Sequence, residues 1–182
     1  MSKILVVIDM QNDFIDGALG SPEAQAIVPN VIAKVKQYAE SGDGIIYTAD
    51  THGGDYLETM EGRKLPVPHC IHGTDGWEIP KDIYKFDAPV IMKDTFGSWE
   101  LPHYVMNMAG SSVEEIEKLE SIEVVGLCTD ICVISNVMML KAWFPNTKIV
   151  VDATCCAGVT PESHENALRA MEMCHIEVIR GV

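Results

Sequence analysis

The feature of this sequence that most constrains its fold is the alternation of short β-branched runs with longer segments of helical periodicity. Val and Ile favour extended backbone, so six runs are predicted as strands: KILVVIDM (3–10), GIIYTAD (44–50), PVIMKD (89–94), IEVVGLC (122–128), TKIVVDA (147–153) and IEVIR (176–180). Mostly apolar strands that are separated by helices predict a parallel sheet covered on both faces. We therefore expect an α/β fold of the Rossmann-like kind, with three α/β/α layers around a six-stranded, mostly parallel sheet.

Chain length and charge narrow the class of protein further. The 182 residues, 47% of them hydrophobic, suffice for one sizeable core, so residues 1–182 are predicted to form a single domain. A net charge of −14 disfavours nucleic acid and anionic membranes as partners. The first apolar run, residues 4–8, is too short for a signal peptide or a membrane span, which predicts a cytoplasmic protein. In that compartment the six cysteines are expected to stay reduced.

Polar and reactive residues follow the predicted strands at their carboxyl ends. The residues that end the first five strands are Asp9, Asp50, Lys93, Cys128 and Asp152. Ligands of parallel sheets bind at this edge, where the carboxyl ends of the strands meet. We therefore expect these side chains to gather at one edge of the sheet and to form the candidate site there.

Cys132 is the candidate nucleophile, because it lies in the first turn of the helix predicted after strand 122–128. The free amides and partial positive charge of a helix N-terminus lower a thiol's pKa and can hold an oxyanion. Asp9 follows five apolar residues, so burial is expected to raise its pKa toward a value useful for a general base. Lys93 would stabilise the negative charges of the Cys132 thiolate and of Asp9 if its side chain points to the site. Purely structural roles remain as alternatives: a buried small Cys132, a capping Asp9 and a surface Lys93.

The segment of about residues 51–87 is predicted to be an irregular insertion that carries ligands. It is rich in Gly, Pro and His, and a long non-periodic stretch in a compact domain is often functional. Asp50 and His52 stand two apart at its start, and Glu61, His69 and His72 follow. Carboxylates mixed with imidazoles suit Zn²⁺, Fe²⁺ or Mn²⁺, whereas isolated Asp and His on loops are usually only solvated. This segment is therefore a candidate metal and substrate loop.

Residues 130–144 are apolar nearly all round, which predicts a buried helix. Such a helix packs either in the core of its own chain or against another subunit. The sequence leaves both cases open. Packing against another subunit would make the protein a homo-oligomer, which is the state we predict.

Several segments resemble the isochorismatase-like cysteine hydrolases and, within them, the nicotinamidases. VVIDMQNDF resembles the family's opening strand with its catalytic Asp, here Asp9, and KDTFGS resembles the strand end with the catalytic Lys, here Lys93. GLCTDICV resembles the nucleophile turn and places Cys132 at the nucleophile's position. DATCCAGVTPESH resembles the segment around the fifth strand, so the resemblance covers nearly the whole chain.

The DTH motif and PVPHCIHGTDGW resemble the metal loop of nicotinamidases, which implies a divalent metal, with zinc expected and iron or manganese as alternatives, and no organic cofactor. The ligand positions fall on Asp50, His52, Glu61 and His69. Phe14 matches an aromatic residue that lines the substrate pocket. Many nicotinamidases carry an aromatic residue three positions before the last metal histidine, where this chain has Pro66. The ring-stacking wall must therefore come from elsewhere, or the substrate is not nicotinamide.

The resemblance implies an amidase that acts through a thioester on a small-molecule amide, most simply nicotinamide to nicotinate and ammonia. Asp9 would take the proton of Cys132, and the thiolate would attack the carboxamide carbonyl. The backbone amides of Cys128 and Cys132 would form the oxyanion hole, beside a cis peptide at Leu127–Cys128. Two alternatives are a metal-free amidase for another small amide, such as a carbamoyl or ureido compound, and a non-enzymatic binding module with a reactive Cys132.

Overall fold

Six strands form one sheet in the computed structural model, which describes residues 3–85, 87–110 and 112–181. The strands are β1 (Lys3–Ile8), β2 (Gly44–Asp50), β3 (Val90–Lys93), β4 (Ser121–Leu127), β5 (Lys148–Ala157) and β6 (Glu177–Ile179). Their order is β3-β2-β1-β4-β5-β6, and every neighbouring pair is parallel. The predicted six-stranded sheet is thereby confirmed.

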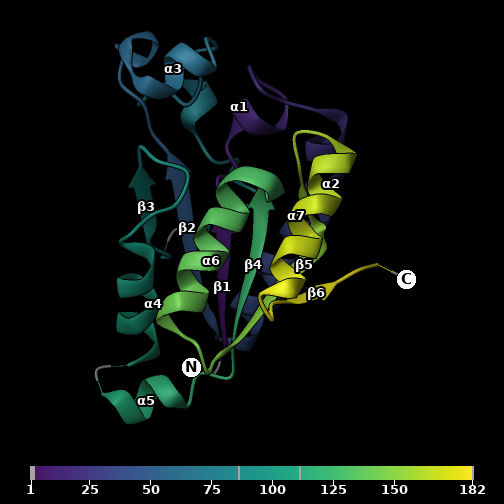
Figure 1. Ribbon diagram of the computed structural model, residues 1–182. Coiled ribbons are helices and arrows are strands. Elements are labelled where there is room, and N and C mark those ends of the chain that lie inside the picture. Colours follow the sequence, from purple (N-terminus) through teal and green to yellow (C-terminus); the bar gives the residue numbers. More distant parts are fainter. Residues whose placement is uncertain (1–2, 86, 111, 182) are drawn as a thin grey trace.

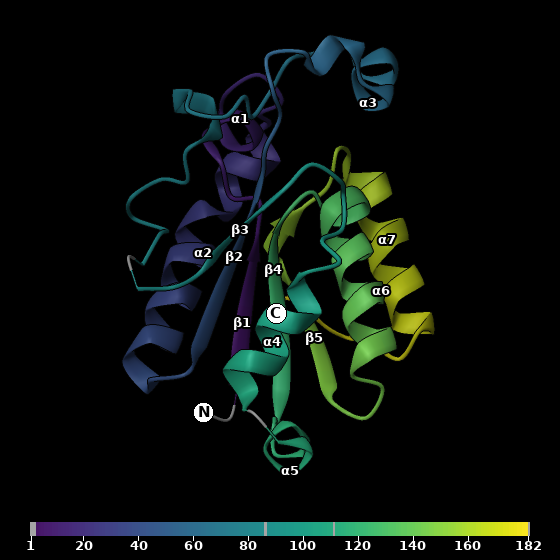
Figure 2. The ribbon, with the colours of Figure 1, turned by 90° about the vertical axis from the view of Figure 1, so that its left-hand side faces the viewer.

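Helices cover both faces of this sheet and complete the predicted three layers (Figures 1 and 2). Helix α2 (Pro22–Ser41) covers one face, and α4 (Leu101–Ala109), α6 (Ile134–Trp143) and α7 (Pro161–Met173) cover the other. The short helix α5 (Val113–Glu117) lies near the amino-terminal end of the strands (Figure 1). The α/β/α architecture follows from the sequence pattern, but α4 is an element that the pattern did not predict.

Burial on both faces explains why the central strands are apolar along their whole length. In β1, Ile4, Val6 and Ile8 belong to the core cluster under α4, α6 and α7. Leu5 and Val7 belong to the cluster under α2. Successive side chains of a strand point to opposite faces, so a strand between two helical layers needs apolar residues at every position.

The carboxyl ends of the strands point toward the end of the molecule that carries α1 (Asn12–Ile15) and α3 (Met60–Lys64) (Figure 1). The insertion predicted at about 51–87 lies here, although its residue 86 is outside the described residues. It holds α3 and two single turns, η1 (Tyr56–Glu58) and η2 (Asp75–Trp77), and is otherwise irregular. The insertion therefore covers the edge at which ligands of parallel sheets bind.

One local expectation is wrong, and another differs from the structure only in the type of helical turn. Strand β5 does not end at Asp152 but continues to Ala157, so Asp152 lies in mid-strand. There it pairs with Lys34 at 2.9 Å and does not join the other predicted strand-end residues. The helix expected to start near Thr129 does start there, but its first turn, η3 (Thr129–Val133), is a π turn, and α6 follows from Ile134. Cys132 thus lies in the first helical turn, as expected, and this turn is wider than an α-helical one.

The fold leaves three predictions untested: the single domain of residues 1–182, the homo-oligomer and the cytoplasmic location. Residues 1, 2 and 182 of the predicted domain lie outside the described residues. All six cysteines are described, and each is a free thiol, as expected. Within the described ranges, no helix has the length and apolar character needed to cross a membrane.

Candidate active site

Three buried groups meet at the carboxyl ends of β1, β3 and β4. Asp9 directly follows β1, Lys93 is the last residue of β3, and Cys132 lies in η3 after β4. The Lys93 Nζ atom lies 2.7 Å from Asp9 Oδ2 and 3.6 Å from Cys132 Sγ. All three residues are at most 5% exposed. The structure therefore brings together the carboxylate, ammonium and thiol that the sequence singled out.

A glycine allows β4 to approach the backbone next to Asp9. Gly126 has a φ of +121°, and a Cβ atom there would lie 2.1 Å from the carbonyl oxygen of Ile8. Only a residue without a side chain fits this approach. The peptide bond between Leu127 and Cys128 is cis, as the family resemblance implied. Together these features carry the chain from β4 into η3 close beside the end of β1.

The charges of the three groups depend on their burial. Burial raises the pKa of Asp9, and the positive charge of Lys93 opposes this shift. Burial works against the charge of Lys93, but the Asp9 carboxylate raises the pKa of Lys93 above its ordinary value. Burial and the neighbouring Asp9 raise the pKa of the Cys132 thiol well above its ordinary value. The expected lowering of that pKa by a helix N-terminus is thus wrong, and the resting Cys132 needs a base to take its proton.

Buried polar residues that the sequence reasoning missed hold these groups in place. The Thr48 hydroxyl donates to Asp9 Oδ1 at 2.6 Å. Gln11 accepts the Asp50 N–H at 2.7 Å and donates to the Asp50 carbonyl at 2.8 Å. The Asn136 amide donates to the Cys132 carbonyl at 2.8 Å. A polar residue inside a buried strand or helix is the sequence signal that could have found Thr48 and Asn136, whereas Gln11 lies between β1 and α1.

Four side chains form a candidate metal site beside this triad. One nitrogen or oxygen ligand atom from each of them lies within 4.8 Å of the others: Asp50, His52, Glu61 and His69. Asp50 Oδ2 lies 3.0 Å from His52 Nε2 and 3.5 Å from His69 Nε2, and Glu61 Oε1 lies 3.8 and 3.7 Å from the same two atoms. Ligand atoms at the corners of a zinc tetrahedron lie about 3.3–3.6 Å apart. The geometry and the His₂AspGlu donor set therefore fit a divalent metal.

The surroundings orient these ligands toward a common point. The Nδ1 atom of His69 donates to the Val67 carbonyl at 2.8 Å, and Nε2 faces Asp50 Oδ2 at 3.5 Å, so a metal that displaced the Nε2 proton would find a lone pair there. Burial acts to raise the pKa of Asp50, but hydrogen bonds from His52 and His69 hold it below its ordinary value, so Asp50 is a carboxylate. His72, the remaining histidine of the loop, instead packs edge-on against Trp77 at 4.7 Å and is outside the group of four.

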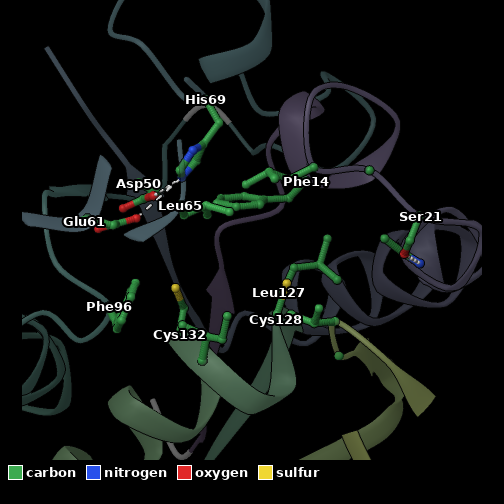
Figure 3. A pocket seen from close by; sticks show the side chains of 16 residues that line it. Phe14, Ser21, Asp50, Glu61, Leu65, His69, Phe96, Leu127, Cys128 and Cys132 are labelled. Carbon is green, nitrogen blue, oxygen red and sulfur yellow. Dashed lines mark hydrogen bonds and ion pairs between the residues drawn. The ribbon is translucent and has the colours of Figure 1, made fainter. Parts of the chain in front are cut away.

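One cavity of about 470 Å³ connects the thiol with the candidate metal site. Phe14 lines it and packs edge-on against His69, with ring centroids 5.5 Å apart. Figure 3 shows the Cys132 sulfur pointing into the space between Phe14 and the Asp50–Glu61 group. Pro66 is exposed and does not line the cavity, whereas the neighbouring Leu65 does. An aliphatic wall thus faces Phe14 here.

The fold and the site define a class of protein: a three-layer α/β hydrolase with a buried thiol, carboxylate and ammonium beside a candidate metal site. The isochorismatase domain model matches residues 3–181, and the chain belongs to the isochorismatase family. The family that the sequence motifs suggested is thereby confirmed.

Two relatives and one solved structure are similar to this chain over most of its length. The nicotinamidase/pyrazinamidase of Mycobacterium tuberculosis is 23% identical over 184 residues, which cover 97% of this chain and 98% of the relative. A probable inactive nicotinamidase of Arabidopsis thaliana is 31% identical over 170 residues, or 88% of this chain and 83% of the relative. The solved structure of the pyrazinamidase of Pyrococcus horikoshii in complex with zinc has a TM-score of 0.82 at 24% identity and covers 100% of both chains. The likeness to that structure confirms the fold.

Proposed function

We propose that this isochorismatase-family hydrolase cleaves nicotinamide to nicotinate and ammonia through a thioester on Cys132. The observation that carries the proposal is the meeting of Asp9, Lys93 and Cys132 in one cavity with the candidate metal site. A thiol needs a base within reach, and a buried carboxylate with a raised pKa can take its proton. The Mycobacterium tuberculosis relative adds support, because it is a nicotinamidase/pyrazinamidase of nearly the same length.

The first half-reaction forms the thioester. Asp9 takes the proton of the Cys132 thiol, and the sulfur forms a bond to the carboxamide carbon while the C=O electron pair moves to oxygen. The backbone N–H groups of Cys128 and Cys132 would stabilise that oxyanion. When the oxyanion collapses, the C–N bond breaks, and Asp9 returns its proton to the leaving nitrogen, which departs as ammonia.

The second half-reaction regenerates the thiol. Water attacks the thioester carbon while Asp9 takes one of its protons, and the C–S bond then breaks. The proton on Asp9 returns to the sulfur, and the carboxylic acid is released. Lys93 keeps its positive charge throughout and stabilises whichever of Asp9 and Cys132 is anionic.

Asp50, His52, Glu61 and His69 would hold the metal, for which we propose zinc because two imidazoles and two carboxylates suit it. When bound, the metal supplies a Lewis acid that can accept the lone pair of a pyridine nitrogen. Phe14 supplies one apolar wall for the ring. These features favour nicotinamide over an amide that lacks a ring nitrogen.

The test is ammonia release from nicotinamide, with Cys132→Ala as the control. We expect hydrolysis by the wild-type protein, none above background by the variant, and loss of activity after chelation that zinc restores. No loss of activity on chelation, in protein that contains no metal, would count against a metal-dependent nicotinamidase and favour a metal-free amidase. The Arabidopsis relative, a probable inactive nicotinamidase, makes the control essential. If wild type and Cys132→Ala release equal ammonia across a panel of small amides, the proposal fails.

A further inference from the structure

The cavity is larger than the reacting groups require. A volume of about 470 Å³ lies in the range of pockets that enclose drug-sized ligands. Its charged carboxylates, Asp50 and Glu61, both belong to the candidate metal site. Most of the other lining residues are apolar, and two of them, Phe96 and Val159, are 47% and 60% exposed. Exposed apolar side chains that gather at a pocket are typical of a binding surface.

The Phe96 wall is anchored to α6, the helix that directly follows the turn with the nucleophile. The side-chain amide of Asn136, fully buried on α6, donates to the Phe96 carbonyl at 3.2 Å and to the Cys132 carbonyl at 2.8 Å. The Asn136 Oδ1 atom accepts the N–H of Ser98 at 2.9 Å. Figure 3 shows Phe96 beside Cys132, on the side of the cavity away from Phe14. One buried side chain therefore fixes both the nucleophile and this wall.

The Val159 wall is anchored to the nucleophile turn in a similar way. Its N–H donates to Asp130, whose two carboxylate oxygens lie 3.1 and 3.2 Å away. Asp130 lies in η3, two residues before Cys132. The backbone of both walls is thus hydrogen-bonded to the segment that carries the sulfur, which favours a preorganised recognition surface.

We propose that the part of the cavity lined by Phe96 and Val159, called the outer cavity below, is a subsite for an apolar substituent of the amide substrate. Phe96 and Val159 would be its specificity-determining walls. The substrate class would be heteroaromatic carboxamides that carry an alkyl or aryl group on a ring carbon away from the amide. This inference rests on the proposed function for the reaction, but it concerns selectivity between substrates. The apolar walls favour uncharged substituents, because the outer lining offers no ion-pair partner among its residues.

The experiment compares nicotinamide with 5-propyl- and 5-isopropylnicotinamide by ammonia release, because C5 is not bonded to the ring nitrogen that the metal would hold. Each methylene buried against an apolar wall is worth up to about fourfold in kcat/KM. We therefore expect at least one propyl compound to exceed nicotinamide about tenfold or more. Phe96→Ala and Val159→Ala should each lower that preference several-fold. Trp99→Ala is the matched control, because Trp99 is a nearby aromatic residue that is 70% exposed and does not line the cavity.

A second measurement separates this inference from the proposed function. Calorimetry on Cys132→Ala gives the same preference as a ratio of Kd values without turnover. If nicotinamide is cleaved and neither propyl compound is preferred in rate or binding, the subsite is refuted and the function stands. If propyl compounds bind more tightly and nicotinamide is not cleaved, the subsite stands and the proposed substrate is wrong. An equal preference in wild type, Phe96→Ala and Val159→Ala would also refute the subsite.

Discussion

The Thr48 hydroxyl offers a direct test of the role proposed for Asp9. Thr48 lies on β2, is fully buried and donates to Asp9 Oδ1 at 2.6 Å. The other Asp9 oxygen pairs with Lys93 at 2.7 Å. Thr48→Val keeps the shape of the side chain but removes both the donor to Asp9 Oδ1 and the hydroxyl that accepts the Asp9 N–H at 3.2 Å. The Asp9 N–H keeps a second acceptor in the Thr48 carbonyl at 3.2 Å, so the pH profile reports mainly on the hydrogen bond to the carboxylate of the proposed base.

The size of the effect follows from that bond. A hydrogen bond to a charged group is worth about 1.5–3 kcal/mol, and one pKa unit corresponds to about 1.36 kcal/mol. Burial raises the pKa of Asp9, Lys93 lowers it, Asp50 raises it, and the Thr48 bond lowers it. Removal of the Thr48 donor should therefore raise the pKa of Asp9 further, by about one to two units.

The sign of the pH effect is fixed by which form of Asp9 reacts. Asp9 accepts the proton of Cys132 only as a carboxylate, so activity is lost as the pH falls through its pKa. The acidic limb of the kcat/KM profile should thus move to higher pH in Thr48→Val, by about one to two units. On that limb the variant would be about 10–100-fold slower than wild type at the same pH.

The assay is a pH profile of ammonia release for wild type, Thr48→Val and Thr48→Ser. Serine retains the hydroxyl, so its acidic limb should stay close to that of wild type. Circular dichroism and thermal unfolding check that both variants fold. An acidic limb that does not move in a folded Thr48→Val would show that Asp9 is not the base, or that the bond to Thr48 does not stabilise its carboxylate.

Three further substitutions test the site and its support. Cys132→Ala should lower kcat/KM at least about a thousandfold while Cys128→Ala stays mild, and equal losses would mean that the turn is misread. Lys93→Met should keep the far-UV spectrum and lose at least about a hundredfold in kcat/KM, so full activity in a folded variant would refute its role. Lys34→Met should cost about 3 kcal/mol in urea unfolding, because Lys34 pairs with Asp152 at 2.9 Å in a largely buried network. Despite burial, bonds to Thr154 and Lys34 lower the pKa of Asp152, so this cost should be full at neutral pH and shrink below about pH 4.

The sheet could be predicted because its signal is local. Each strand of the sheet carries its own apolar run, and the alternation with helices leaves parallel pairing as the simple arrangement. Helix α4 was missed because it follows an irregular loop after β3 and is only nine residues long. The end of β5 was misplaced because Asp152 resembles a strand end in sequence, yet its partner Lys34 comes from α2, more than one hundred residues away. Such pairing is set by tertiary structure.

In the candidate site, too, some features could be predicted from the sequence and others could not. Asp9, Lys93 and Cys132 could be proposed from position alone, because each follows an apolar strand at the edge where ligands bind. Their charges could not all be predicted. The sequence places Cys132 after a strand, where a helix dipole would lower the thiol pKa, but the fold buries it beside Asp9, and that raises the pKa. The effect expected from the local position of Cys132 is outweighed by burial and by a carboxylate that only the tertiary structure brings close.

The turn that carries Cys132 and the helix that follows it anchor the walls of the outer cavity, and this arrangement separates chemistry from selectivity. Asn136 on α6 holds the segment of Phe96, and Asp130 in η3 holds the segment of Val159, while Asp9 and Lys93 sit at strand ends. Substitutions at the exposed tips can therefore change which substituent fits without moving the sulfur or its base. Strand ends give the rigid positions that covalent catalysis needs, and loops give variable ones. Selectivity in this protein should accordingly respond to Phe96 and Val159 while the pH profile set by Asp9 stays fixed.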